Sequence, residues 1–111
     1  MVKAGSLRKR YVLFEFRGAE LDEEPLKRAI YAEALRFFGE YGLSHAALKL
    51  VSFDKKEKKG ILRCERDHLD KVLGFLALID SLDGSAARLI AVKSSGTLKA
   101  LGSTEASTQP R

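Results

Sequence analysis

The order of two kinds of hydrophobic spacing along the chain most constrains its fold. Four short β-branched, aromatic and aliphatic runs are typical of strands, and two longer stretches with apolar residues three or four positions apart are typical of helices. Their order, β-α-β-β-α-β, is the split β-α-β or ferredoxin-like pattern. We therefore predict an α+β sandwich in which two helices pack on one face of a four-stranded antiparallel sheet, with strands one and three in the middle.

The predicted boundaries follow from turn and cap residues. In order, they are a strand over 11–16, a helix from Asp22 to a C-cap at Gly42, a strand over 48–53, a hairpin turn over 54–59, a strand over 61–65, a helix capped by Asp67, a turn at Asp83-Gly84 and a strand over 88–93. Imperfect alternation in residues 48–53 allows a β-bulge. After Gly96 the chain starts a short helical turn that continues to Leu101.

The central strands place two pairs of residues side by side on the face that the helices leave uncovered. Tyr11 and Leu13 come from strand one, and Ile61 and Arg63 come from strand three. A tyrosine beside an arginine on an open sheet can stack on bases and contact phosphate. A partner protein that covers the same face is the equal alternative. Phe38, on the first helix, belongs either to the core or to a subunit contact.

The 111 residues are enough for one domain with a modest core. We expect a flexible basic arm over 1–8, a single domain over 9–102 and a disordered polar tail over 103–111. The one cysteine, Cys64, excludes an intrachain disulfide and suits a reducing cytosol. No apolar run approaches the roughly 18 to 20 residues that span a bilayer, so we expect a cytoplasmic protein with no membrane partner.

Charge is distributed unevenly along the chain. Residues 20–40 hold six acidic and three basic residues, a net charge of −3, and because the whole chain carries +5 the remainder carries +8. Four basic residues fall in the first ten positions, and four lysines crowd the predicted hairpin turn: Lys55, Lys56, Lys58 and Lys59. Such a surface favours binding to a phosphate backbone through counterion release. Lysines kept for solubility are the alternative.

The stretch from Lys93 to Lys99 ends the last predicted strand with Ser95, Gly96 and Thr97. A strand end that brings backbone N–H groups, a hydroxyl and the start of a helical turn into one corner is a natural anion site. A lysine lies on each side of it. The alternative is an ordinary Ser/Gly turn with solvated lysines.

Catalytic residues are hard to find in the sequence. His45 and His68 have no partner at metal-binding or catalytic spacing, and Cys64 alternates toward the core. Ile61, Arg63 and Cys64 stand where the stacking rings of an RNA-recognition sheet would be expected. We therefore expect no catalysis by this chain alone, and recognition of the backbone or shape of a folded RNA rather than of single bases.

Four ordered segments carry a family resemblance: residues 9–15 (KRYVLFE), 53–54 (FD), 60–64 (GILRC) and 95–99 (SGTLK). From about Arg8 to Leu101 the chain resembles the archaeal branch of the Pop-five family, the component 2 proteins of ribonuclease P. The resemblance implies an accessory subunit of a ribonucleoprotein endonuclease that removes 5′ leaders from precursor tRNA. It also implies that the RNA uses the catalytic magnesium and that the protein itself binds no cofactor.

Partners and site residues follow from the same resemblance. The implied partners are ribonuclease P RNA, ribonuclease P protein component 3 and, indirectly, precursor tRNA, with two copies of each protein. Carried over by position, the residues expected at the RNA or in the family framework are Arg8, Lys9, Arg10, Arg63, Ser95, Gly96, Thr97 and Lys99. Lys93 and the hairpin lysines are additions from charge alone. The alternative function is a ferredoxin-like regulatory or ligand-binding module that self-associates through its sheet.

Overall fold

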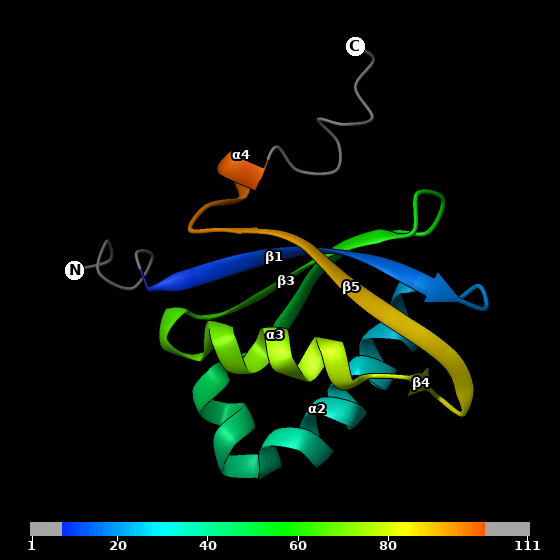
Figure 1. Ribbon diagram of the computed structural model, residues 1–111, viewed down its shortest axis with the longest axis horizontal. Helices are drawn as coiled ribbons and strands as arrows, with labels where there is room; N and C mark the ends of the chain where they lie inside the picture. The colour runs from blue at the N-terminus through cyan, green and yellow to red at the C-terminus, as the bar shows by residue number, and fades with distance from the viewer. Residues whose placement is uncertain (1–7, 102–111) are drawn as a thin grey trace.

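The described part of the chain folds into an antiparallel sheet of five strands and two long helices (Figure 1). The computed structural model describes residues 8–101, without the side chains of Lys99 and Ala100, so the expected tail and all of the expected arm except Arg8 lie outside the described residues. The elements are β1 (Lys9–Gly18), α2 (Glu23–Ala46), β2 (Lys49–Asp54), β3 (Lys59–Glu65), the 3-10 turn η1 (Arg66–His68), α3 (Leu69–Leu78), β4 (Ser81–Leu82), β5 (Ser85–Ser95) and α4 (Leu98–Leu101). None of these helices is long and apolar enough to cross a membrane.

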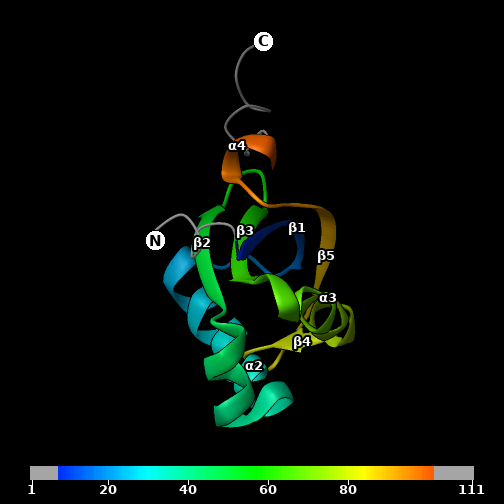
Figure 2. The same cartoon turned by 90° about the vertical axis from the view of Figure 1, so that its left-hand side faces the viewer.

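The strand order is β2-β3-β1-β5-β4, and the sheet curls over the two long helices (Figure 2). β1 is paired along most of its length with β3 on one side and β5 on the other. The prediction that strands one and three are central neighbours is therefore confirmed. The expected bulge in the second strand is also present, as a register shift between Leu50 and Ser52.

The predicted count of four strands is wrong, because β4 precedes the last predicted strand. Asp83 and Gly84 both have positive φ, 54° and 81°, as the two central residues of a type I′ hairpin turn do. Such a turn joins two paired strands, and Leu82 of β4 indeed lies opposite Ser85 of β5. The Asp-Gly pair, interpreted from the sequence as a simple turn, therefore makes a hairpin.

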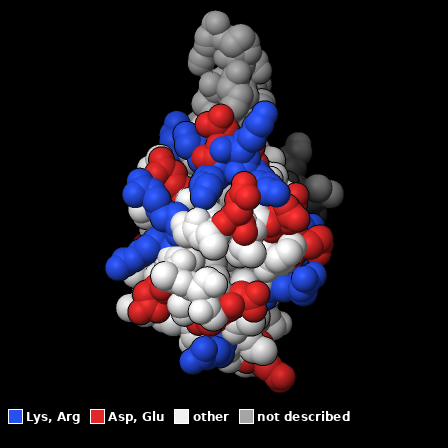
Figure 3. Space-filling view, turned by 90° about the vertical axis from the view of Figure 1, so that its right-hand side faces the viewer, with Lys and Arg blue, Asp and Glu red and all other residues white. Residues whose placement is uncertain are grey.

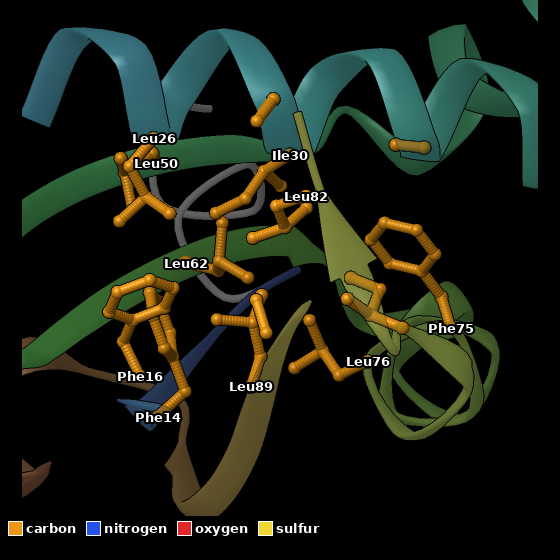
Figure 4. Close-up of a cluster of buried hydrophobic side chains, with 14 of the residues drawn as sticks. Phe14, Phe16, Leu26, Ile30, Leu50, Leu62, Phe75, Leu76, Leu82 and Leu89 are labelled. Carbon is orange, nitrogen blue, oxygen red and sulfur yellow. The ribbon is translucent and has the colours of Figure 1, made fainter. Parts of the chain in front are cut away.

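The core lies between one face of the sheet and the two long helices (Figure 4). Alternation in β1 points its even-numbered apolar residues into this layer, and the apolar stripes of α2 and α3 meet them from the other side. The buried side chains include Val12, Phe14, Phe16, Leu26, Ile30, Leu62, Phe75 and Leu76. No polar or charged residue is buried in the described chain, so hydrophobic burial rather than a polar network determines the packing.

The end of the first helix differs from the predicted one. Gly39 interrupts α2 with a left-handed φ of 77°, a conformation that glycine adopts without steric cost. The chain then resumes its helical turns beyond Gly42, the predicted C-cap, as far as Ala46. The actual C-cap is Ala47, whose backbone N–H donates to the carbonyl oxygen of the preceding turn.

The two predicted N-caps are also corrected. Asp22 occupies the N-cap position of α2, but its side chain makes no capping hydrogen bond; its carboxylate pairs with Lys55 at 2.7 Å instead. Asp67 lies inside the η1 turn, and the N-cap of α3 is His68. For Asp22, it is a segment distant in sequence that changes the role of the aspartate.

The face of the sheet opposite the long helices is partly covered, contrary to the prediction. α4, the expected short helical turn, lies over this face (Figures 1 and 2). Ile61 of β3 and Leu101 of α4 are only 3% and 5% exposed, although neither belongs to the main core. Tyr11 and Leu13 are half-buried. Ile61 is therefore not part of the exposed surface of the isolated chain.

We predict that Gly60→Ala destabilises the fold by about 1 to 3 kcal/mol, the usual cost of overpacking. An added Cβ would lie 2.6 Å from Cζ of the buried Phe14 ring and 3.0 Å from the Ser52 carbonyl oxygen. Urea unfolding of the variant and of the wild type measures the difference.

Gly74→Ala is the matched control for this substitution. Gly74 is exposed on α3, and outside its own helical turn no heavy atom lies within 4 Å of the added Cβ. This change is expected to stabilise the protein by about 0.5 to 1 kcal/mol. A Gly60→Ala protein as stable as the wild type would contradict the tight contact with Phe14.

Candidate nucleic-acid interface

Three chain segments meet at the end of the sheet where β1 begins. Lys9 lies opposite Glu65 at the end of β3, and Tyr11 lies opposite Ser95 at the end of β5. The backbone N–H that follows Glu65 donates to the carbonyl oxygen that precedes Lys9, at 2.6 Å. This register gathers five basic residues, which we call the basic corner: Arg8, Lys9, Arg10, Arg66 and Lys93.

Two cations of the basic corner are held by their neighbours. Lys9 Nζ donates to Glu65 Oε2 at 2.7 Å, and this hydrogen bond lowers the pKa of Glu65 below its ordinary value. Arg10 Nη1 donates to the Lys9 carbonyl oxygen at 3.0 Å. The same guanidinium lies against Gly96, where an added Cβ would be 3.1 Å from Nη1. Glycine at position 96 thus leaves room for the arginine.

The other three cations of the basic corner are exposed. Arg8 and Lys93 form no ion pair with any residue that the structure describes, and Arg66 forms only a long one with Asp67, at 3.7 Å. An exposed ion pair of this kind contributes little to stability. These side chains can therefore turn toward an anionic ligand at small cost.

The turn after β5 offers an anion fewer hydrogen-bond donors and a smaller partial charge than its sequence indicates. The Thr97 backbone N–H donates to Ser95 Oγ at 3.2 Å, so one of the expected donors is directed at the turn itself. α4 has four residues, too few for a large partial charge at its N-terminus. The side chain of Lys99 lies outside the described residues. Anion binding here stays a prediction, supported mainly by the cations of the basic corner.

The hairpin lysines lie at the other end of the sheet. Lys59 is opposite Glu15 of β1, whereas Glu65 is opposite Lys9. The six residue steps of β3 between Lys59 and Glu65 correspond to about 20 Å of strand. The structure therefore does not bring the hairpin and the basic corner together, and a ligand that contacts both must extend across the sheet.

Two of the hairpin lysines are engaged within the protein. Lys55 Nζ lies 2.7 Å from Asp22 Oδ1, and this hydrogen bond raises the pKa of Lys55 above its ordinary value. Lys58 Nζ donates to the Gly18 carbonyl oxygen at 3.1 Å and lies 5.8 Å from the centre of the Phe16 ring. Figure 3 shows this end of the molecule, where basic and acidic side chains are interleaved.

On the second face of the sheet, Tyr11 lies opposite Arg63 and Leu13 lies opposite Ile61, so the predicted side-by-side arrangement is confirmed. Nε of Arg63 is buried and has no hydrogen-bond partner among the described residues. Phe38 lies on the other side of the sheet, with its ring centroid 5.6 Å from a phenylalanine ring of α3. The four residues predicted for a partner interface therefore do not form one surface.

The described residues hold no group of three or more His, Cys, Asp or Glu side chains that could bind a metal ion. The ring of His45 is held at the end of α2, with Nδ1 3.0 Å from the Tyr41 carbonyl oxygen. Cys64 is fully buried, and burial is the main cause that raises the pKa of its thiol to about 11. What residues 8–101 offer to a ligand is charge and shape.

Sequence reasoning missed Arg66 as a member of the basic corner. In the sequence, Arg66 stands between Glu65 and Asp67, where the local charge is balanced, so it belongs to no basic cluster. The pairing of β3 with the start of β1 is the signal that identifies it, since this pairing places the end of one strand beside the beginning of the other.

The fold and its cation clusters define a small α+β domain suited to a polyanionic ligand. Comparison with known proteins narrows this class. The sequence profile of the Rpp14/Pop5 family matches residues 10–104, and the chain belongs to this family. The expected resemblance to the Pop-five family is thus confirmed.

Individual relatives agree with this assignment. Ribonuclease P protein component 2 of Pyrococcus furiosus is 34% identical over 95 residues, which cover 85% of this chain and 79% of the relative. The protein of the same name from Archaeoglobus fulgidus is 37% identical over 93 residues, 83% of each chain. A chain in the cryo-EM structure of yeast ribonuclease MRP shares the fold, with a TM-score of 0.65 at 14% identity, over 83% of this chain and 76% of that one.

We predict that Cys64 is nearly inert toward Ellman's reagent at pH 8. With a pKa of about 11, only about one thiol in a thousand is ionised at that pH, and the thiolate is the reacting form. The reaction is expected to be at least about 100-fold slower in the native protein than in concentrated guanidinium chloride. Equal rates in the two states would show that Cys64 is exposed.

Proposed function

We propose that this protein is a subunit of ribonuclease P that binds and organises the catalytic RNA for removal of 5′ leaders from precursor tRNA. The family match over residues 10–104 is the observation that carries this proposal. The relatives named ribonuclease P protein component 2 support the same assignment. In this proposal the RNA supplies the magnesium chemistry, and the protein binds no cofactor of its own.

The basic corner is the part of the protein that we assign to the RNA. Its exposed cations, Arg8, Arg66 and Lys93, project from three different chain segments and can neutralise phosphates where RNA segments crowd together. Each phosphate neutralised releases condensed counterions, so binding gains free energy and depends on salt. The protein would thereby replace part of the magnesium that the folded RNA otherwise requires.

The partners of the complex are part of the same proposal. Ribonuclease P protein component 3 is the proposed protein partner, with two copies of each protein, and the complex is proposed to be cytoplasmic. The name of the relatives, ribonuclease P protein component 2, supports an assembly with further protein components. The half-buried Tyr11 and Leu13, beside α4, offer a small apolar contact for such a partner.

Reconstitution tests the function directly. Ribonuclease P RNA and component 3 are assayed on precursor tRNA at low magnesium, with and without this protein. Cleavage that requires the protein supports the proposal. Cleavage that is unchanged by the protein, with an active component 3, would reject it and favour a module that self-associates through its sheet.

We predict that Arg8→Gln/Lys93→Gln weakens RNA binding and lowers the slope of log affinity against log salt by about one to two units. The matched control, Lys56→Gln/Lys59→Gln, removes the same charge at the hairpin. Its effect is expected to be smaller, because the acidic start of α2 lies beside the hairpin and pairs with it. A salt titration of RNA binding measures both slopes, and an unchanged slope in the Arg8→Gln/Lys93→Gln variant would show that the basic corner does not contact the RNA.

A further inference from the structure

An open groove runs along the outer edge of β2, between this strand and α2. Its volume is about 870 Å³, and it is separate from the basic corner and from the hairpin. β2 is the last strand on its side of the sheet, so nothing in the described chain closes the groove. Neither the family assignment nor the proposed RNA interface explains this surface.

The wall of the groove is apolar. Leu35, Leu43 and Leu48 line it, and Leu35 remains 44% exposed. The one aromatic lining residue is Tyr31, whose hydroxyl oxygen accepts the backbone N–H of Leu50 at 3.0 Å. This hydrogen bond satisfies an edge donor of β2, and an added β-strand cannot use that donor. The groove is therefore suited to side chains rather than to strand addition.

Four cations surround the apolar wall: Lys27, Arg28, Lys49 and Arg63. No acidic residue lines the groove, and none of the four forms an ion pair with a described residue. Arg63, whose Nε is buried without a hydrogen-bond partner within residues 8–101, is one of the lining residues and is partly exposed. Cations without an acidic partner around an apolar wall favour a ligand that carries carboxylates.

We propose that the groove docks an acidic, partly apolar peptide segment of a partner protein. Aliphatic or aromatic side chains of the segment would fill the apolar wall, and carboxylates would pair with the surrounding cations. RNA fits less well, because single-stranded bases bind by stacking on exposed rings and by hydrogen bonds to their edges. The groove offers one ring, with its hydroxyl already engaged, and a wall of leucines.

Residues 1–7 and 102–111 do not match the chemistry of the groove. Residues 1–7 contain no acidic residue, and residues 102–111 contain one and no large apolar side chain. The acidic stretch before α2 is already engaged, since Leu21 packs against the core and Asp22 pairs with Lys55. Charge complementarity with the four cations favours a segment of a different protein as the occupant.

A short synthetic peptide that alternates Glu or Asp with Leu or Phe is the probe for this site. Its control has the same apolar residues with Gln and Asn in place of the acids. Binding to the full-length protein is followed by fluorescence anisotropy and by NMR of leucine methyl groups. We expect saturable binding of the acidic peptide only, with shifts at Leu35, Leu43 and Leu48. Methyl chemical-shift changes centred elsewhere, or equal binding of both peptides, would overturn the proposal. This test uses the wild-type protein alone.

The variant Lys27→Glu/Leu35→Ser changes one cation and one apolar residue of the groove. We expect it to weaken binding of the acidic peptide at least about tenfold. The matched control is Lys71→Glu/Leu78→Ser on α3, at an exposed lysine and at a leucine that is 68% exposed. It should change the affinity by less than about twofold. Circular dichroism establishes that both variants are folded.

An oligouridylate probe separates this site from the proposed RNA interface. RNA affinity should fall no further in the groove variant than in the α3 variant, which carries the same charge change. If only the groove variant loses RNA affinity and the peptide is unaffected, the groove is an RNA site and the peptide proposal is wrong. If the peptide fails to bind, this inference fails, whereas the ribonuclease P assignment is unaffected.

Discussion

The pairing of β1 on both of its sides is the constraint on which the rest of the structure depends. One face of β1 supplies Val12, Phe14 and Phe16 to the core between the sheet and the long helices. The other face carries the half-buried Tyr11 and Leu13, and α4 lies on this side of the sheet (Figure 1). Its first residues hold the ends of β3 and β5, and this register assembles the basic corner. The hydrophobic core and the proposed RNA interface are thus two consequences of one set of backbone hydrogen bonds.

Local patterns predicted much of the fold. The alternation of β1 and the helical spacing of α2 and α3 identified the core face correctly, and strand order followed from a known topology. The parts that were missed depend on contacts between segments distant in sequence. Asp22 is paired with Lys55 instead of capping its helix, and Ile61, predicted for the open face, is only 3% exposed. Local hydrophobic patterns cannot predict such contacts between segments that are distant in sequence.

The candidate site was predicted in composition but not in geometry. Counting charges indicated a basic protein, yet it could not show that the hairpin lysines and the basic corner lie at opposite ends of β3. It also treated every lysine as available, whereas Lys9, Lys55 and Lys58 have partners within the protein. Arg66 escaped notice because only the register of β1 and β3 places it in the corner. The basic corner and the hairpin therefore differ in how many of their cations are exposed and available to a ligand, and net charge does not show this difference.

The short length of β4 has a consequence for how the sheet resists unwanted association. β4 covers only Ser85 and Ala86, so β5 is the outer strand of the described sheet over the rest of its length. A long open edge is a template for pairing with other chains and for aggregation. β5 carries Arg88 and Lys93 along this edge and an irregularity in its register opposite Leu13 and Phe14. Charge and a distorted ladder are features by which natural edges avoid such pairing. Lys93, which we propose to contact RNA, therefore also helps to protect this edge of the free protein from pairing with other chains.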